Sequence, residues 1–325
     1  MKRTIALLLA VVMCFALVAC GGKNDTTPAD TTPADTTPAD TTPADTTPAD
    51  TTPADTTPAD TTPAEPEDDK LDAATVNIFI AASLEGAFKE IIEMYKQVQP
   101  NVTINYNADS SGALLTQISE ANGNGCDIFF SAAVKQVKSL NDDYGLMVEG
   151  SRVDLLCNQV CVISAKGSGT AVTGLANIAD AKSIALADGS VPVGKYTRQA
   201  LVNLGVIGEA EDVATITTEE IAEQLGGVEI NECGNVSKVK EAVKEGSNEV
   251  GTVYYSDAYS VRDDVDIIEM VSTELTGDII YPMCRVTNGE ADEAETAAAI
   301  DFYEYIQSDD CLKVFEDYMF VIYEG

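Results

Sequence analysis

The sequence of 325 residues contains no histidine, and basic residues of any kind are few. Lys and Arg together number 19 against 54 Asp and Glu, which gives a formal net charge of -35 at pH 7. Without histidine, the most common general base of enzymes is missing, and no Gly-x-Ser-x-Gly nucleophile motif occurs. Without a basic face, the phosphate contacts that nucleic-acid binding needs are missing too. The composition argues against most enzymes and against a nucleic-acid partner.

A long hydrophobic run is also missing at the N-terminus. The apolar run from about Thr4 to Val18 follows Lys2 and Arg3 and is short for the roughly 20 residues of a membrane span. It ends in Leu17-Val18-Ala19-Cys20, which resembles the lipobox of bacterial lipoproteins. We therefore interpret residues 1–19 as a lipoprotein signal peptide and Cys20 as the acylated first residue, with a single transmembrane anchor as the alternative. This predicts an extracytoplasmic protein, lipid-anchored to the outer face of the cell membrane.

Large apolar side chains are missing from the next segment, residues 20–70. The unit Thr-Thr-Pro-Ala-Asp recurs from Thr26 to Asp60. Such a sequence cannot offset the entropy cost of ordering, and its regular prolines favour extended polyproline II stretches. We expect a disordered tether that spaces a globular domain from the membrane. A mucin-like glycosylated stalk is the alternative, and it has the same spacing function.

The cysteines do not form a metal-binding pattern. Six of the eight lie in the globular part, and there is no Cys-x-x-Cys pair and no histidine, so a zinc site is not expected. Cys157 and Cys161 lie in one strand-like run, which separates them by about 13 Å and excludes a disulfide between them. We expect most of the six to be small core residues: Cys126, Cys157, Cys161, Cys233, Cys284 and Cys311.

From about Leu71 onward, strand-like and helical patterns alternate. The strand–helix order of residues 75–140 predicts a parallel sheet covered by helices, and the same alternation restarts after Asp154. The chain is thus expected to form two α/β lobes. The predicted strands are 75–82, 102–106, 127–131, 155–164, 184–187 and 250–255, and the predicted helices include 84–95, 114–118, 134–140, 195–204, 236–243, 293–306 and 311–318.

Four junctions lie where predicted helices begin, two of them at strand ends of the first lobe and two before helices of the second lobe. In open α/β sheets, ligands bind beyond the carboxyl ends of strands, where helix N-termini offer free N–H groups. A serine at such a place is usually a helix cap, but four junctions could together present donors to one anion. The residues alone thus indicate a two-lobed binder of an anion. The junctions are Ala81-Ala82-Ser83-Leu84, Asp109-Ser110-Ser111-Gly112, Val191-Pro192-Val193-Gly194 and Cys233-Gly234-Asn235-Val236.

From about Thr75 to the C-terminus, the sequence resembles the molybdate-binding proteins that supply ABC transporters. The matching segments occur in the family's order: Ala81–Leu84, Ser110–Leu114 with Gln117-Ile118, Asp127–Ala132, Val191–Tyr196, Gly251–Ala258 and Tyr281-Pro282.

This resemblance implies a two-lobed periplasmic-binding-protein fold of the Venus-flytrap kind (type II). Mixed or parallel sheets flanked by helices would close over a tetrahedral oxyanion, molybdate or tungstate, with no cofactor and no direct metal ligand. Carrying the family's contacts over by position gives five ligand-binding residues: hydroxyl and backbone donors from Ser83 and Ser111, backbone N–H groups from Val193 and Val236, and the phenol of Tyr254. The expected partners are a permease with its ATPase, and the protein is expected to be a monomer.

The resemblance also implies discontinuous lobes, with residues 71–156 and 283–325 in the first lobe and 157–282 in the second. Cys157 and Cys284 would then lie in the two crossover strands, where they could form a disulfide. Other functions stay open at this stage: a binding protein for sulfate, phosphate or a small organic acid, an enzyme that relies on carboxylates, or a surface adhesin on a stalk.

Overall fold

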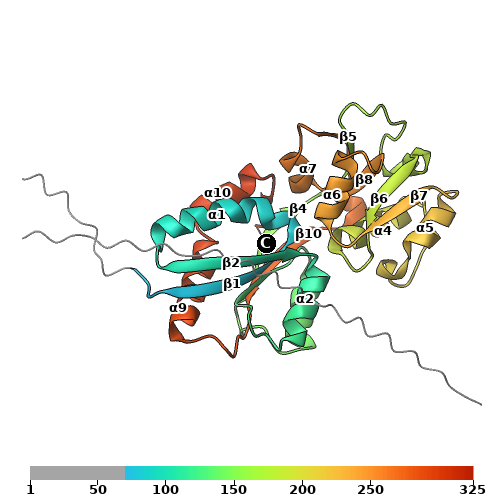
Figure 1. Ribbon diagram of the computed structural model, residues 1–325. Helices are drawn as coiled ribbons and strands as arrows, with labels where there is room; N and C mark the ends of the chain where they lie inside the picture. Colours follow the sequence, from blue (N-terminus) through green and yellow to red (C-terminus); the bar gives the residue numbers. More distant parts are fainter. Residues whose placement is uncertain (1–69, 325) are drawn as a thin grey trace, which may run out of the picture. The chain divides into compact units, whose positions relative to one another are not determined.

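The computed structural model describes residues 70–324. They belong to one compact unit, Pro63–Gly325, whose helices and strands carry the labels of Figure 1. The predicted signal peptide (1–19), Cys20 and the predicted tether up to residue 69 lie outside the described residues.

The first lobe is built on a six-stranded sheet in the order β11-β4-β10-β3-β1-β2. β1 pairs in parallel with β2 and with β3, as the strand–helix alternation predicts. β10 pairs antiparallel with β3 and β4, and β11 pairs antiparallel with β4, so the whole sheet is mixed, which agrees with the mixed or parallel sheets that the resemblance implies. The strands are β1 (Ala74–Ala81), β2 (Val102–Asp109), β3 (Ile128–Phe130), β4 (Val153–Asn158), β10 (Ile279–Arg285) and β11 (Val321–Ile322).

Among the described residues, five helices pack on this sheet, and each buries apolar side chains. Figure 1 shows α1, α2, α9 and α10 around the strands. On α1, the side chains of Phe88, Ile91 and Tyr95 recur at helical spacing and are fully buried. The Phe88 ring packs edge-on against Phe130 of β3, with 5.9 Å between centroids. The helices are α1 (Glu85–Val98), α2 (Ser111–Glu120), α3 (Val134–Asp142), α9 (Glu293–Tyr305) and α10 (Asp309–Asp317), and the short 3-10 helix η2 (Ala82–Leu84) precedes α1.

The second lobe is built on a five-stranded sheet in the order β7-β6-β8-β5-β9. β6 pairs in parallel with β7 and β8, whereas β5 pairs antiparallel with β8 and β9. The strands are β5 (Val160–Ala165), β6 (Ser183–Ala187), β7 (Glu229–Cys233), β8 (Val250–Tyr254) and β9 (Val265–Met270). The helices are η3 (Leu175–Asp180), α4 (Pro192–Asn203), η4 (Val213–Thr215), α5 (Thr218–Gln224), α6 (Val236–Lys244), α7 (Tyr255–Ser260) and α8 (Thr273–Thr276).

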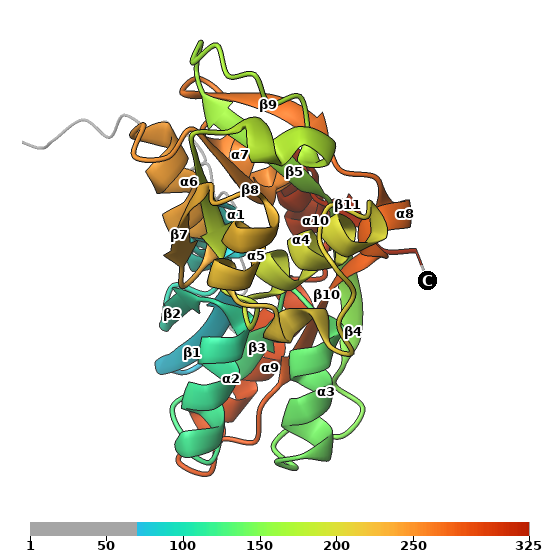
Figure 2. The ribbon, with the colours of Figure 1, turned by 90° about the vertical axis from the view of Figure 1, so that its right-hand side faces the viewer.

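The apolar run 155–164, predicted as one strand, is two strands that belong to different sheets. Gln159 separates β4 from β5, and its side-chain amide donates to the carbonyl of Val271, 2.8 Å away. The chain therefore leaves the first sheet at β4 and returns to it at β10, and these strands run antiparallel to each other (Figure 2). The predicted lobe boundaries, 156/157 and 282/283, fall inside β4 and β10 and stay a prediction.

All six cysteines of the described residues are free thiols, and five of them are buried. The disulfide expected between Cys157 and Cys284 is wrong. In the ladder of β4 and β10, Cys157 faces Ile280, whereas Cys284 faces Phe129 of β3. Four residues along β10 put the two cysteines about 13 Å apart, beyond the reach of a disulfide.

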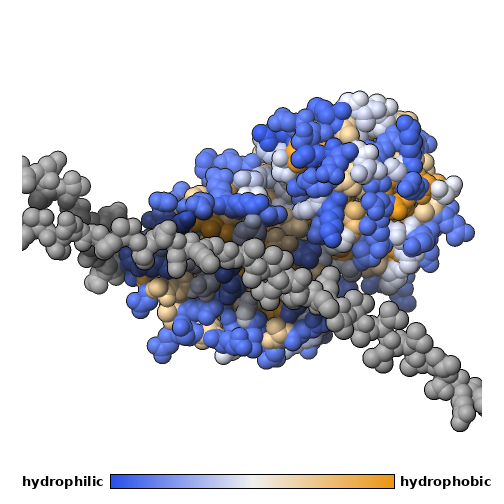
Figure 3. All heavy atoms as spheres, in the orientation of Figure 1, coloured by the Kyte–Doolittle hydropathy of each residue, from blue (hydrophilic) through white to orange (hydrophobic). Residues whose placement is uncertain are grey.

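Hydrophilic side chains cover most of the described face shown in Figure 3. Among residues 70–324, no helix combines the length and the apolar character that crossing a membrane requires. The same residues hold no group of three or more His, Cys, Asp or Glu side chains arranged to bind a metal ion.

Candidate functional site

The structure brings all five sequence-predicted site residues around one small cavity between the lobes. The cavity has a volume of about 10 Å³, which is room for about one water-sized group. None of its lining side chains is a lysine or an arginine. The lining residues are Ala81, Ala82, Ser83, Asp109, Ser110, Ser111 and Ala132 from the first lobe, and Val191, Pro192, Val193, Val236 and Tyr254 from the second.

Ser83 and Ser111 reach the cavity without acting as helix caps. Leu84 is the N-cap residue of α1, so the expectation that Ser83 caps this helix is wrong. Ser83 lies in η2, and its Oγ is 2.9 Å from the hydroxyl oxygen of Tyr281. Ser110, one residue earlier than Ser111, caps α2 by accepting from the N–H of Ala113.

Ser111 is the first residue of α2, and its hydroxyl oxygen is already used as an acceptor. The backbone N–H of Ala132, at the end of β3, donates to Ser111 Oγ over 2.9 Å. The hydroxyl hydrogen of Ser111 has no acceptor among the described residues, so it is free to point at a ligand. Its backbone N–H, in the first turn of a helix, has no intrahelical partner either.

The second lobe contributes two helix N-termini. Val193 is the second residue of α4, and Val236 is the first residue of α6. The N-cap position of α4 is Val191, which has no polar side chain to cap the helix, and Pro192 has no N–H. The Val193 amide is therefore an open donor at the positive end of the helix dipole, and so is that of Val236.

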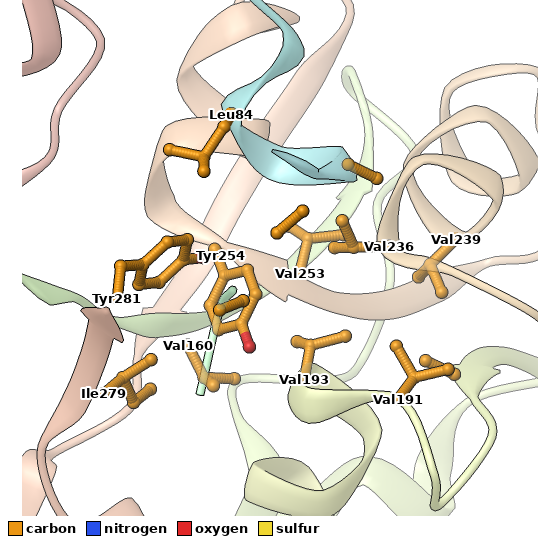
Figure 4. Packing of buried hydrophobic residues seen from close by; sticks show 14 of the residues in the cluster. Leu84, Val160, Val191, Val193, Val236, Val239, Val253, Tyr254, Ile279 and Tyr281 are labelled. Carbon is orange, nitrogen blue, oxygen red and sulfur yellow. The ribbon is translucent and has the colours of Figure 1, made fainter. Parts of the chain in front are cut away.

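Tyr254 ends β8, and its hydroxyl is fully buried without a hydrogen-bond partner among the described residues. Its ring packs edge-on against Tyr281, with 5.7 Å between centroids. In Figure 4 the Tyr254 oxygen points toward the Val193 side of the cluster, away from Val253. Burial raises the pKa of the Tyr254 hydroxyl well above its ordinary value, so this group is a protonated donor.

Arg198 of α4, which the sequence analysis did not single out, holds the junction between β6 and α4. Its fully buried guanidinium donates to the carbonyls of Ala187 (2.7 Å), Gly194 (3.0 Å) and Ile216 (2.8 Å). A Cβ at Gly194 would lie only 2.2 Å from the carbonyl oxygen of Asp188, so only glycine fits there. The sequence did hold a signal: residues 189–195 have the Gly-x-x-x-x-Gly-Lys spacing of anion-binding loops, although Tyr196 replaces the usual Ser or Thr.

Two carboxyl groups lie near the cavity. Asp109 lines it, and its Oδ1 accepts from the N–H of Ser110 (2.7 Å) and from the Asn235 side-chain amide of the other lobe (3.0 Å). Asp257 of α7 is buried, and burial raises its pKa to about 6, although Lys240, 4.0 Å away, opposes this shift. The charge nearest to the cavity is thus an Asp109 carboxylate already engaged by donors.

A larger cleft of about 390 Å³ shares the lining residue Pro192 with the small cavity. Lys135 of α3 and Lys195 of α4 line this cleft from opposite lobes. Neither makes an ion pair with an acidic side chain of residues 70–324.

Comparison with known proteins identifies the family to which this chain belongs. Residues 76–321 match the family described as bacterial extracellular solute-binding protein. A Bacillus subtilis protein named as an ABC transporter substrate-binding lipoprotein, YvgL, is 33% identical over 253 residues, which is 78% of this chain and 88% of that protein. The molybdate-binding protein ModA of Mycobacterium tuberculosis is 28% identical over 197 residues, 60% of this chain and 67% of its own.

Solved structures show the same fold. The substrate-binding domain assigned to a molybdenum ABC transporter of Clostridium difficile has 30% sequence identity and a TM-score of 0.55, covering 77% of this chain and 100% of that one. The sulfate-binding protein SubI of Mycobacterium tuberculosis has a TM-score of 0.60 but only 12% identity, covering 78% and 88%, and is similar in fold alone.

Proposed function

This chain belongs to the bacterial extracellular solute-binding protein family, and we propose that it captures molybdate or tungstate between its lobes and delivers the ion to an ABC importer. The hydroxyls of Ser83, Ser111 and Tyr254 and the backbone N–H groups of Val193 and Val236 hold the ion. A permease with its ATPase is the partner, as the names of the relatives suggest.

The unpartnered hydroxyl of Tyr254 is the observation that carries this proposal. A buried hydroxyl without a partner costs about 1–3 kcal/mol, and proteins rarely leave one in place. Tyr254 lies beside two open helix N-termini and beside the hydroxyls of Ser83 and Ser111. A ligand that accepts hydrogen bonds from every side satisfies all these groups at once.

The donor set explains how a doubly charged anion binds without a lysine or an arginine. Hydrogen bonds to an ionised acceptor are roughly twice as strong as bonds between neutral groups, and helix dipoles add to them. The small cavity volume favours a compact inorganic ion over a larger organic acid. Closing the lobes completes the donor shell and creates the shape that the transporter recognises.

The same donor set discriminates among tetrahedral oxyanions. A protonated phosphate brings an O–H for which the five donor groups offer no acceptor, and the Asp109 Oδ1 at the cavity already accepts two hydrogen bonds. Sulfate carries no proton, and it is rejected because it is smaller than molybdate and leaves the donors too far away. The site thus selects molybdate and tungstate in two ways: phosphate is excluded because it carries a proton, and sulfate because it is too small.

The remaining parts of the proposal concern the rest of the chain. Acylated Cys20 anchors the protein to the outer face of the membrane, and residues 20–70 tether the binding unit to it. The protein works as a monomer without a cofactor, and its two α/β lobes comprise residues 71–156 with 283–325 and residues 157–282.

Calorimetric titration of the purified protein with molybdate, tungstate, sulfate and phosphate tests the function. We expect one-to-one binding of molybdate or tungstate, with sulfate and phosphate giving no heat. The Ser83→Ala variant should bind about 5- to 150-fold more weakly, because it loses one hydrogen bond to a charged ligand. Absence of binding by all four ions would refute the proposal, and preferential binding of sulfate would reassign the ligand.

A further inference from the structure

Behind the cavity, a chain of hydrogen bonds leads from the crossover segment to Ser83. The Asn158 side-chain Nδ2 donates to the hydroxyl oxygens of Ser256 (2.9 Å) and Tyr281 (3.3 Å). The Tyr281 hydroxyl is in turn 2.9 Å from Ser83 Oγ. Tyr281 is fully buried and does not line the cavity, but two residues that it contacts do: its hydroxyl bonds to Ser83, and its ring packs on Tyr254.

The direction of this chain is fixed at Asn158. The backbone N–H of Gln159 donates to Asn158 Oδ1 over 2.8 Å, which holds the side-chain amide in one orientation. The Nδ2 group therefore faces the two hydroxyls, and its two hydrogens are both used. The Tyr281 oxygen consequently receives a hydrogen bond from Asn158.

The hydrogen of the Tyr281 hydroxyl is then donated to Ser83 Oγ. Among the described residues, Ser83 Oγ is the acceptor within hydrogen-bond distance of Tyr281, since Asn158 presents a donor and the Tyr254 hydroxyl makes no hydrogen bond. If Ser83 donated instead, the fully buried Tyr281 hydrogen would have no partner, which is costly. Burial also raises the pKa of Tyr281 well above its ordinary value, so the hydrogen stays on the phenol.

We propose that Tyr281 and Asn158 are positioning residues that fix the Ser83 hydroxyl as a hydrogen-bond donor to the bound oxyanion and so exclude protonated ions. Because Ser83 Oγ accepts from Tyr281, its own hydrogen is directed to the cavity. Ser111 is held in the same way by the N–H of Ala132. Each serine oxygen thus already accepts one hydrogen bond, so it has only one lone pair left and is a poorer acceptor for a ligand O–H. This inference rests on the proposed function and concerns selectivity at the same site.

The test compares molybdate, which carries no proton at neutral pH, with arsenate, a similar tetrahedral ion that does. The Tyr281→Phe variant keeps the ring that packs on Tyr254 and removes only the hydroxyl. We expect molybdate to bind about 5- to 30-fold more weakly. Arsenate should lose less affinity or gain some, because Ser83 Oγ no longer accepts from Tyr281 and becomes a better acceptor for the arsenate O–H, so the ratio of molybdate to arsenate affinity falls.

A double-mutant cycle with Ser83→Ala separates positioning from a general structural effect. If Tyr281 acts through Ser83, Tyr281→Phe should change molybdate affinity less than about twofold in the Ser83→Ala background. Tyr95→Phe is the matched control, because it also removes a tyrosine hydroxyl of the first lobe, one that donates to Asp301. It should leave both affinities unchanged.

Should Tyr281→Phe fail to fold, Asn158→Asp tests the same chain. The new carboxylate accepts a hydrogen bond from the Tyr281 hydroxyl. The Tyr281 oxygen then accepts from Ser83, so the Ser83 hydrogen no longer points into the cavity. We expect weaker molybdate binding whose loss is again smaller in the Ser83→Ala background.

The outcomes distinguish this inference from the proposed function. If the unmodified protein binds none of the oxyanions, the proposed function fails. If it binds molybdate, but Tyr281→Phe or Asn158→Asp has the same effect with and without Ser83, or leaves the preference over arsenate unchanged, the positioning role is overturned and the proposed function stands.

Discussion

Tyr254 and Tyr281 are both buried phenols in edge-to-face contact, yet their hydroxyls have opposite states. The Tyr281 hydroxyl bonds to Ser83 and Asn158, whereas that of Tyr254 has no partner among the described residues. Tyr281 therefore supports the wall of the cavity, whereas Tyr254 presents an unused hydrogen-bond donor to a ligand in the cavity. A donor left in this way destabilises the empty protein and strengthens its affinity for an acceptor ligand.

Replacing Tyr254 by Phe should therefore have two effects of opposite sign. The empty protein should keep its stability or gain up to about 1 kcal/mol, because an unsatisfied hydroxyl is removed, while molybdate affinity should fall about 5- to 150-fold. Thermal unfolding without ligand and calorimetric titration measure the two effects. Tyr95→Phe should behave in the opposite way, losing stability and keeping affinity. If Tyr254→Phe left the molybdate affinity unchanged, Tyr254 would serve only in packing.

At the level of elements, the cavity is built where strands end and helices begin. The β6–α4 junction is the most constrained of these, because Arg198 binds three carbonyls and Gly194 lies against the end of the strand. The guanidinium is buried without an ion pair, and burial lowers its pKa from the ordinary value. Its role is to orient the first turn of α4, whose Val193 amide faces the cavity.

The Arg198→Met variant should lose about 3 kcal/mol of stability, because three buried carbonyls lose a charged donor. Urea unfolding measures this loss, and the ligand affinity should fall with it as the first turn of α4 shifts. Arg262→Met is the control: Arg262 is exposed, stacks on Tyr259 and donates to its carbonyl, so its loss should cost less than about 1 kcal/mol. A small effect at Arg198 would show that the junction holds its shape without it.

At the level of the whole binding unit, the two lobes meet at specific points around the cavity. The Asn235 amide of the second lobe donates to Asp109 of the first. Gly112 of α2 approaches the carbonyl of Ser190, to which an added Cβ would lie 3.2 Å. These contacts come from residues far apart in sequence, and they form only when the lobes are close.

Gly112→Ala should hinder this approach without harming the first lobe. An alanine suits a helix better than glycine does, so the stability without ligand should be unchanged or higher by up to about 1 kcal/mol. The added methyl group pushes against Ser190, and molybdate affinity should fall several-fold in calorimetric titrations. Gly289→Ala, where a Cβ meets Asn124 of the same lobe at 3.4 Å, should not change affinity. Equal affinities for the two variants would contradict the role of this contact.

Much of the local structure could be predicted from the sequence. The helices α1, α4, α6 and α9 coincide with the helical patterns to within a few residues, because one face of each carries the regular apolar side chains that the core buries. The strand 155–164 was divided wrongly because two buried strands in succession look like one long strand. Strands β7 and β9 were not predicted, and neither was β11, because a two-residue strand has no detectable period.

The sequence by itself determined the chemistry of the site: hydroxyl and amide donors at strand ends, no histidine and a strongly acidic chain. Those features depend on residue type and local pattern, which a chain carries before it folds. The tertiary structure decided which groups are buried, which are left without partners and in which direction the hydrogen bonds run. Asn158, Tyr281 and Arg198 acquire their roles through contacts across 11 to 198 positions of the sequence, and only packing brings such residues together.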